Sequence, residues 1–300
     1  MRANAYLWFM AEKLQTISDI QRHLSLMLGR LWPPEEAAAL ASSIILEYTG
    51  MNRGTQLAFG DRPVEKEQLE RILAAAARAA DGEPLQYILG YTLFCGQRIE
   101  VGSGVLIPRP ETEEMTAMII ADNRGYTGTV TDLCTGSGCI AIALSAAFPE
   151  ATVVAAENAP AALRAAARNI QLTGTSAQLI AADILSQAPE TVPVSDIIVS
   201  NPPYVRMSEM SDMHRNVTEH EPHEALFVTD NDPLLYYRAI AAIADARLEP
   251  GGVLWLEINE QLAAETASLL HANIFENINI IKDIRGKERF IKAVRHGRQT

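Results

Sequence analysis

The sequence is short of cysteine and of positive charge. Its three cysteines form no Cys-x-x-Cys pair, and an odd number of cysteines favours a reducing compartment such as the cytoplasm over a disulfide framework. With 25 Lys and Arg against 37 Asp and Glu, the chain carries a net charge of −12. The broad basic face that nucleic-acid binding needs is therefore not expected, although this charge is compatible with a local basic patch or with a basic protein partner.

Long apolar runs are missing as well. No stretch of about 18 apolar residues occurs, so we expect no membrane span. The apolar start at residues 1–10 is too short for the hydrophobic region of a signal peptide and lacks a small-residue cleavage site. The composition, 48% hydrophobic and 21% charged, is that of a globular protein, and 300 residues suggest two domains. We predict a cytoplasmic protein with no membrane partner and no direct contact with nucleic acid.

The hydrophobic pattern divides the chain into three segments. Residues 1–84 have helical spacing without a Gly-rich loop or a Cys/His cluster, which predicts a helical domain that is either a packed bundle or a docking surface for a macromolecular substrate. Residues 85–107 combine aromatic and β-branched residues with glycine punctuation, which predicts a β-hairpin linker. Residues 108–300 alternate strands and helices, which is typical of an α/β protein with a parallel, doubly wound sheet.

Seven strands are expected in the third segment. The first five are short apolar runs that alternate with helical segments, and the last two are expected to form an antiparallel hairpin at the sheet edge. The predicted strands are Thr129–Leu133, Thr152–Ala156, Ala177–Ala182, Ser195–Ser200, Val253–Ile258, Ile278–Ile281 and Phe290–Val294.

Three of these strands are followed by residues that suit a nucleoside ligand. The turn Cys134-Thr135-Gly136-Ser137-Gly138 lets the backbone approach a ligand closely, but it is not the Gly-x-Gly-x-x-Gly fingerprint, which disfavours NAD. Glu157, about 20 residues further, is suited to accept the two hydroxyls of a ribose. Asp183 is suited to accept from an adenine amine, with Ile184 packing on the ring. The alternative for both acids is a helix cap.

The fourth strand leads into Asn201-Pro202-Pro203-Tyr204. The two prolines stiffen the loop and remove two backbone donors. The Asn201 side-chain oxygen and the Pro202 carbonyl then form a pair of acceptors that matches the two N–H donors of a planar NH2 group. Tyr204 adds an aromatic face or a hydroxyl. The alternative is a rigid turn in which the asparagine is only a local cap.

Three histidines lie in the acidic segment Met210–Leu226, at positions 214, 220 and 223. Their spacing matches no familiar ligand set, so we expect a solvated or substrate-covering loop and no metal site.

The ordered set of motifs resembles the release factor glutamine methyltransferases, the HemK/PrmC family, over essentially the whole chain. Asn-Pro-Pro-Tyr alone is shared with DNA adenine and RNA guanine N-methyltransferases, whereas the Pro-Arg-Pro-Glu-Thr-Glu segment and the helical N-terminal segment make the combination specific. The matching segments are Gly82–Gly90, Leu106–Glu113, Asp132–Gly138, Asn201–Tyr204 and Glu221–Leu226.

The resemblance implies a Rossmann-like class I methyltransferase that methylates the glutamine of the Gly-Gly-Gln motif in peptide chain release factors. It implies S-adenosyl-L-methionine as cofactor, with residues 134–138 around its methionine part, Glu157 at the ribose, and Asp183 with Ile184 at the adenine. It implies that Asn201 contacts both cofactor and substrate, and that Pro202, Pro203 and Tyr204 complete the substrate and catalytic site.

Four positions depart from the family pattern. Cys134 stands where glycine is usual in the wider methyltransferase pattern, Glu157 where aspartate is more common, Glu257-Ile258-Asn259 in place of Glu-Ile-Gly, and His223 where arginine is usual. The cysteine puts the geometry of the turn in question, the longer Glu157 should still reach a ribose, and His223 is expected to weaken a contact near the substrate loop.

Two other functions compete with this interpretation. A nucleic-acid N-methyltransferase would use the same clamp on a flipped base, and the acidic charge argues against it. A non-catalytic adaptor would bind the cofactor without transferring its methyl group, and the intact Asn201 motif argues against that.

Overall fold

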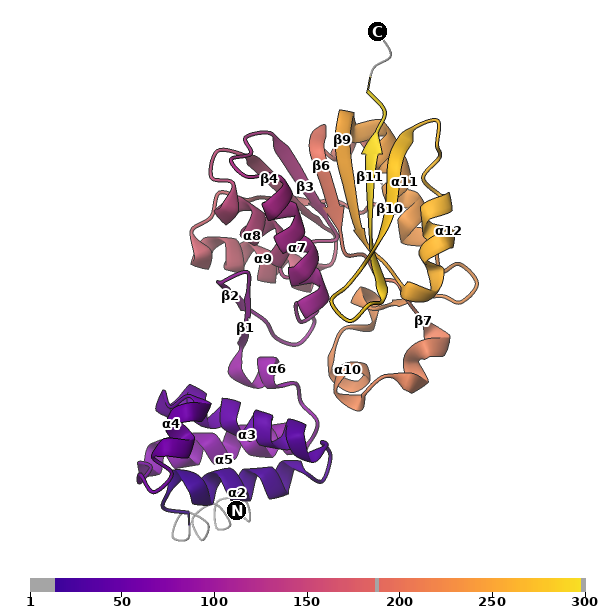
Figure 1. Cartoon of the computed structure of the whole chain (residues 1–300). Coiled ribbons are helices and arrows are strands. Elements are labelled where there is room, and N and C mark those ends of the chain that lie inside the picture. The colour runs from indigo at the N-terminus through magenta and orange to yellow at the C-terminus, as the bar shows by residue number, and fades with distance from the viewer. Residues whose placement is uncertain (1–13, 187–188, 298–300) are drawn as a thin grey trace. The chain divides into compact units, whose positions relative to one another are not determined.

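The computed structural model describes residues 14–186 and 189–297, which form two compact units (Figure 1). The first unit comprises the chain up to Gly90 together with the segment Arg215–His220, and the second comprises Tyr91–His214 and the chain from Glu221 onward. The apolar start at residues 1–10 lies outside the described residues. None of the helices in the described ranges has both the length and the apolar character needed to cross a membrane.

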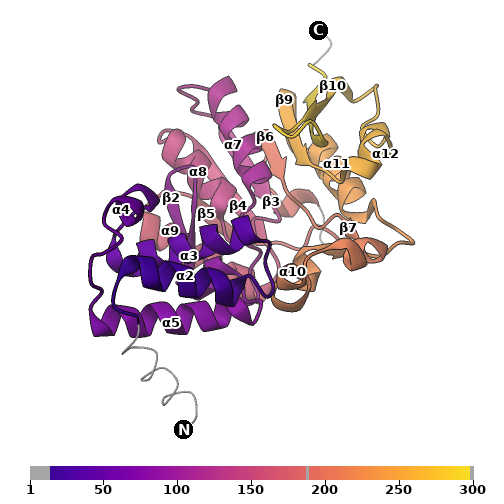
Figure 2. The same cartoon turned by 60° about the horizontal axis from the view of Figure 1, so that its bottom comes forward.

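The first unit is helical, as its spacing predicts. Helix α2 starts with a reciprocal cap in which the Thr16 hydroxyl accepts from Asp19 N and the Asp19 carboxylate accepts from Thr16 N. Helices α2, α3 and α5 lie side by side (Figure 2) and bury one apolar face each in a shared core that includes Leu24, Ile44 and Ile72. The helices are α2 (Ile17–Leu28), α3 (Pro34–Thr49), α4 (Arg53–Ala58), α5 (Lys66–Ala80), α6 (Leu85–Leu89) and α10 (Arg215–His220).

The second unit is built on a seven-stranded sheet in the order β10-β11-β9-β6-β3-β4-β5. The five strands from β9 to β5 are parallel, and β11 pairs antiparallel with both β9 and β10. The predicted α/β architecture with an antiparallel edge is therefore confirmed. The strands are β3 (Thr129–Leu133), β4 (Thr152–Glu157), β5 (Gln178–Ala181), β6 (Ser195–Ser200), β9 (Leu248–Glu257), β10 (Phe275–Lys282) and β11 (Glu288–Arg295).

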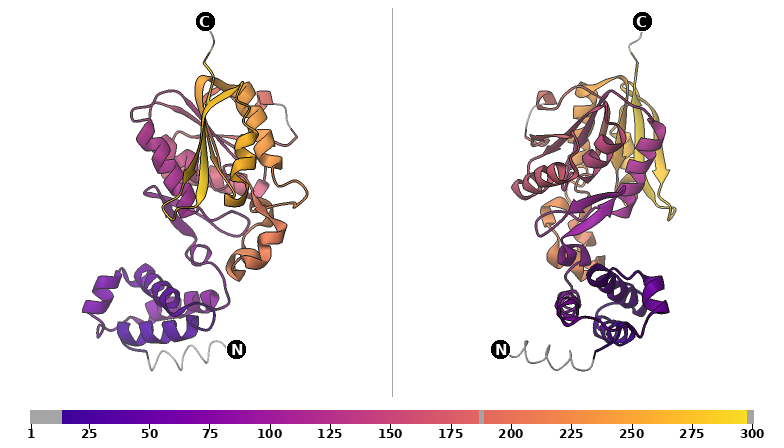
Figure 3. Two further views of the ribbon diagram at one scale, coloured as in Figure 1. Left: turned by 45° about the vertical axis from the view of Figure 1, so that its right-hand side comes forward. Right: turned by 90° about the vertical axis from the view of Figure 1, so that its left-hand side faces the viewer.

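Helices cover both faces of this sheet (Figure 3). On one face α8 is tied to β3, because Ala141 N donates to Asp132. On the other face Tyr237 and Ile240 of α11 pack with Leu133 of β3 in one apolar core. The first layer contains α7 (Pro110–Asp122), α8 (Cys139–Ala147) and α9 (Pro160–Thr173), and the second contains α11 (Leu235–Arg247) and α12 (Ala263–Ser268).

The segment between the helices and the sheet differs from the expected hairpin. Leu85–Leu89 forms helix α6, which starts after Pro84 and stops at Gly90, whose φ of 81° is the left-handed conformation that ends helices. The hairpin is confined to β1 (Tyr91–Phe94) and β2 (Gln97–Glu100), which belong to the second unit.

The segment after Asn201 contains only short elements. They are β7 (Val205–Arg206) and β8 (Phe227–Val228), which pair in parallel, and the 3-10 turns η2 (Met207–Asp212) and η3 (His223–Ala225). Two further turns are η1 (Pro189–Thr191) and η4 (Glu260–Leu262), and η4 directly precedes α12.

Candidate functional site

The strand register aligns the residues that follow the parallel strands. Leu133 of β3 pairs with Ala156 of β4 and with Ser200 of β6, and Ser200 pairs in turn with Leu256 of β9. The next residue along each strand therefore lies at the same carboxyl edge, where open α/β sheets bind their ligands. These edge residues are Cys134, Glu157, Asn201 and Glu257.

The glycine turn has the open backbone that its sequence predicts. Gly136 and Gly138 have φ of 58° and 83°, and a Cβ at Gly138 would lie 3.4 Å from Ala166 of α9. Cys134 also has a positive φ, 59°. This conformation suits the glycine that is usual there in the wider methyltransferase pattern, and the cysteine keeps the geometry at a strain of about 1–2 kcal/mol.

Glu157 supports this turn through its carboxylate. Its Oε2 accepts from Gly136 N at 2.9 Å, and its Oε1 accepts from Asn158 N and Ala159 N, both at 2.9 Å. A carboxylate offers about four lone-pair positions, so three are used and one on Oε2 is left for a ligand hydroxyl. Glu157 thus orders the two residues that lead into α9 and still retains one acceptor position beside the turn.

Asp183 is engaged by its own loop. Its carboxylate accepts from Leu185 N at 3.0 Å and from the Ser186 hydroxyl at 2.6 Å, and these hydrogen bonds, the one from Ser186 first, lower the pKa of Asp183. Ile184 packs against the apolar core beside it. The expected contact of both residues with an adenine ring stays a prediction.

A small hollow joins these residues. Cys134, Glu157, Asp183 and Ile184 line it together with Tyr236 of α11, and its volume of about 20 Å³ holds roughly one water molecule. Tyr236 has the largest side chain in the lining and is half-buried, so it forms one wall of this hollow.

The other half of the edge is a chain of hydrogen bonds that starts at Asn201. Its Nδ2 donates to Thr112 Oγ1 at 2.9 Å, and the Thr112 hydroxyl donates to Glu257 Oε2 at 2.6 Å. The Tyr204 hydroxyl donates to the other oxygen of Glu257 at 2.9 Å. Pro202 and Pro203 between them are buried. One carboxylate therefore holds both ends of the Asn-Pro-Pro-Tyr loop.

Burial determines the pKa values of the ionisable groups in this series of hydrogen bonds. The Glu257 side chain is 1% exposed, and burial raises the pKa of its carboxyl while the Thr112 and Tyr204 hydrogen bonds lower it. Burial, together with the nearby charge of Glu257, raises the pKa of Tyr204 well above its usual value. Tyr204 therefore keeps its proton and uses its hydroxyl to anchor the loop.

A second carboxylate ties two segments of the family pattern together. Glu221 accepts from Arg109 Nη2 at 2.7 Å and from Ile107 N at 3.1 Å, and its side chain is nearly fully buried. His223, two residues further, stacks edge-to-face on Phe227 with ring centroids 5.2 Å apart.

Within residues 14–186 and 189–297, no three His, Cys, Asp or Glu side chains are grouped as a metal site.

The sequence alone pointed to the glycine turn, Glu157, Asp183 and Asn201 but assigned no role to three neighbours. Glu257 had a usable signal, since it follows the fifth strand as Glu157 follows the second. Thr112 lies inside a motif of the resemblance, although nothing local indicates that its hydroxyl faces Asn201. Tyr236 has no signal at all.

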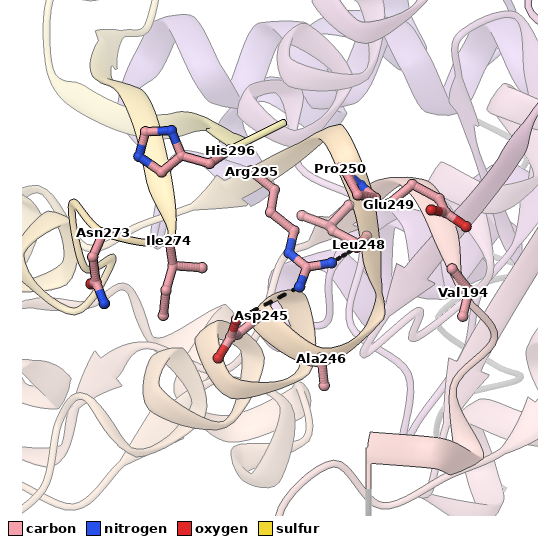
Figure 4. A pocket seen from close by; sticks show the side chains of 10 residues that line it. All are labelled: Val194, Asp245, Ala246, Leu248, Glu249, Pro250, Asn273, Ile274, Arg295 and His296. Atoms are coloured by element: carbon pink, nitrogen blue, oxygen red, sulfur yellow. Dashed lines mark hydrogen bonds and ion pairs between the residues drawn. The ribbon is translucent and has the colours of Figure 1, made fainter. Parts of the chain in front are cut away.

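A larger hollow lies at the opposite edge of the sheet (Figure 4). Its volume is about 520 Å³, and it lies where Val194 precedes β6 and Leu248 begins β9. Arg295 points across it and is held by the Leu248 carbonyl and, at 4.0 Å, by Asp245. Because Arg295 is paired with Asp245 and the hollow lies away from the carboxyl ends of the strands, we do not regard it as the candidate site.

Comparisons with known proteins agree with this geometry. The Methyltransferase small domain family matches residues 89–225, and the PrmC N-terminal domain family matches residues 30–90. The release factor glutamine methyltransferase of Bacteroides thetaiotaomicron is 37% identical over 93% of this chain and 100% of its own. The relatives of that name from Flavobacterium psychrophilum and Bacillus subtilis are 41% and 33% identical, over 89% and 94% of this chain and 94% and 99% of theirs.

Proposed function

The chain belongs to the family of release factor glutamine methyltransferases, and from this premise we propose that it methylates the glutamine of the Gly-Gly-Gln motif in a peptide chain release factor. The methyl group comes from S-adenosyl-L-methionine and goes to the side-chain amide nitrogen. The sulfur–methyl bond would break as the nitrogen–methyl bond forms, the demethylated cofactor would leave as a neutral thioether, and the amide would lose one N–H proton to solvent. The observation that carries the proposal is similarity along nearly the whole chain, which covers 93% of its length for the Bacteroides relative. A match of this extent includes the helical unit as well as the sheet, so it supports the substrate as well as the chemistry.

The division of labour along the chain is part of the proposal. Residues 1–84 dock the release factor and residues 108–300 carry out the transfer. Residues 85–107 connect them, and the division between the two compact units falls within this segment, at Gly90. The matches of two separate families to residues 30–90 and 89–225 support such a division.

The residues at the carboxyl edge fit the cofactor. The turn at residues 134–138 is suited to its methionine part because glycine leaves the backbone open there. The free lone pair on Glu157 Oε2 suits a ribose hydroxyl, and Ile184 offers an apolar surface to the adenine. The cofactor supplies an electrophilic methyl group on a positively charged sulfur.

Asn201 and Pro202 orient the acceptor in this proposal. An amide nitrogen is a weak nucleophile because its lone pair is delocalised into the carbonyl. Asn201 Oδ1 and the Pro202 carbonyl accept hydrogen bonds from its two N–H groups and so orient the nitrogen toward the methyl group. As the nitrogen gains positive charge its N–H groups become stronger donors, so the two acceptors stabilise the transition state more than the ground state. Pro203 and Tyr204 keep the loop rigid.

Mass spectrometry of a release factor tests the proposal directly. The full-length chain is incubated with S-adenosyl-L-methionine and a purified release factor, and the tryptic peptide with the Gly-Gly-Gln motif is expected to gain one methyl group. Total RNA and DNA are incubated in parallel. Methyl transfer to nucleic acid instead of the release factor, or cofactor binding without any transfer to protein, would refute the proposal.

Substitution of Asn201 tests the site within the same assay. Asn201→Ala is expected to lower kcat by about a hundredfold or more, which is typical of losing one polar group that stabilises developing charge, while cofactor affinity stays unchanged. A matched control is Asn123→Ala, which changes an asparagine that caps the far end of α7. Full turnover in the Asn201 variant would remove this residue from the mechanism.

A further inference from the structure

The direction of the Asn201 side chain depends on the proton of one threonine. An asparagine amide has an accepting end and a donating end, and rotation by 180° exchanges them. In the proposed function only the accepting end is useful, because the substrate NH2 group brings two donors. If Asn201 were rotated, its own NH2 group would face the NH2 group of the substrate, and two donors cannot form a hydrogen bond.

The hydrogen-bond chain selects one of these two directions. The Thr112 hydroxyl has a single proton, and at 2.6 Å it is given to Glu257 Oε2. The Thr112 oxygen is then left with lone pairs only, so the group that faces it at 2.9 Å must be the donating end of Asn201. Oδ1 consequently points away from Thr112.

Glu257 is well suited to keep the Thr112 proton in that direction. It is buried, and its other oxygen accepts the Tyr204 hydroxyl at 2.9 Å, so its own position is fixed from two sides. We propose, resting on the function proposed above, that Thr112 and Glu257 are positioning residues that hold the Asn201 amide with its oxygen toward the substrate. Neither touches the reacting atoms, and both act through Asn201.

Substitutions at Thr112 test this role. Thr112→Val keeps the shape and removes the hydroxyl, whereas Thr112→Ser keeps the hydroxyl. The control is Thr116→Val one turn later on α7, which removes an equally buried hydroxyl that donates only to the Thr112 carbonyl. The measurement is single-turnover methyl transfer to a full-length release factor, together with the affinity for S-adenosyl-L-methionine and the urea midpoint of each variant.

We expect Thr112→Val to lower the transfer rate about tenfold to a hundredfold without changing cofactor affinity, as expected for a misdirected reactive group. Thr112→Ser and Thr116→Val should stay within about threefold of the wild type, and Thr112→Val should have no further effect in the Asn201→Ala background, because two residues that act through one group are not additive.

Several results separate this inference from the proposed function. If Asn201→Ala abolishes transfer but Thr112→Val does not slow it, the positioning role is wrong and the function stands. An equal loss in Thr116→Val, or an undiminished effect of Thr112→Val in the Asn201→Ala background, would also overturn the positioning role. If Asn201→Ala itself transfers at the full rate, the proposed site fails first.

Discussion

Glu157→Gln isolates the carboxylate that joins the glycine turn to the second strand. The glutamine has the same shape, but one accepting oxygen becomes a donating NH2 group. Its remaining oxygen is expected to serve Asn158 N and Ala159 N, because two bonds outweigh one. The new NH2 group then faces Gly136 N, which lies 2.9 Å from the carboxylate in the wild type.

The magnitude follows from these contacts. A hydrogen bond to a charged group contributes about 1.5–3 kcal/mol, and the two retained bonds weaken when the charge is removed. Two effects reduce the loss: Gly136 is half-exposed and regains water, and Glu157 no longer repels Asp132, whose pKa it helps to raise. We expect the free energy of unfolding to fall by about 2 kcal/mol.

Urea denaturation without cofactor measures this change, and titration calorimetry measures the affinity for S-adenosyl-L-methionine. Glu150→Gln, which removes a charge from an exposed position, is the control and should change stability by less than about 0.5 kcal/mol. We expect cofactor affinity to fall at least tenfold in Glu157→Gln only. If both variants unfold at the same urea concentration, the carboxylate does not support the turn.

Two further predictions concern the same turn. Burial raises the pKa of Asp132 to about 7, so between about pH 4 and 7 the folded chain holds a proton that the unfolded chain has released. Stability should fall across that window as pH rises, by up to about 1.4 kcal/mol per unit, and Asp132→Asn should lack this slope in urea titrations from pH 4.5 to 7.5. Cys134→Gly should be about 0.5–1 kcal/mol more stable than Cys134→Ala, because only glycine adopts φ of 59° without strain; equal urea midpoints would exclude strain at this position.

Helix and strand signals in this chain are mostly local, which is why the sheet was predictable. Apolar runs such as Ser195–Ser200 end at a polar residue, and that end marks the edge where a parallel strand meets its ligand. Local signals gave the wrong secondary structure where the residue composition favoured a strand but the flanking proline and glycine favoured a helix. Leu85–Leu89 has the aromatic and β-branched character of a strand, but Pro84 and Gly90 bound a single helical turn.

The contacts that orient the candidate site are not local. Thr112 and Glu257 are 145 residues apart and Asn201 and Thr112 are 89 apart, and no spacing rule links them. They meet because Ser200 pairs with Leu256 in neighbouring strands and because α7 packs beside α8 in the helix layer on one face of the sheet (Figure 3). Tyr236 likewise reaches the Glu157 hollow only through the way α11 lies on the sheet.

The amino-acid order was enough to specify the sheet class, the positions of the edge residues and the stiff Asn-Pro-Pro-Tyr loop, since hydrophobic period, glycine and proline act on their immediate neighbours. Which oxygen of Glu157 remains free, which way the Asn201 amide faces and how small the hollow is were decided by folding. Those properties depend on hydrogen-bond partners that strand register and helix packing bring together from distant parts of the chain.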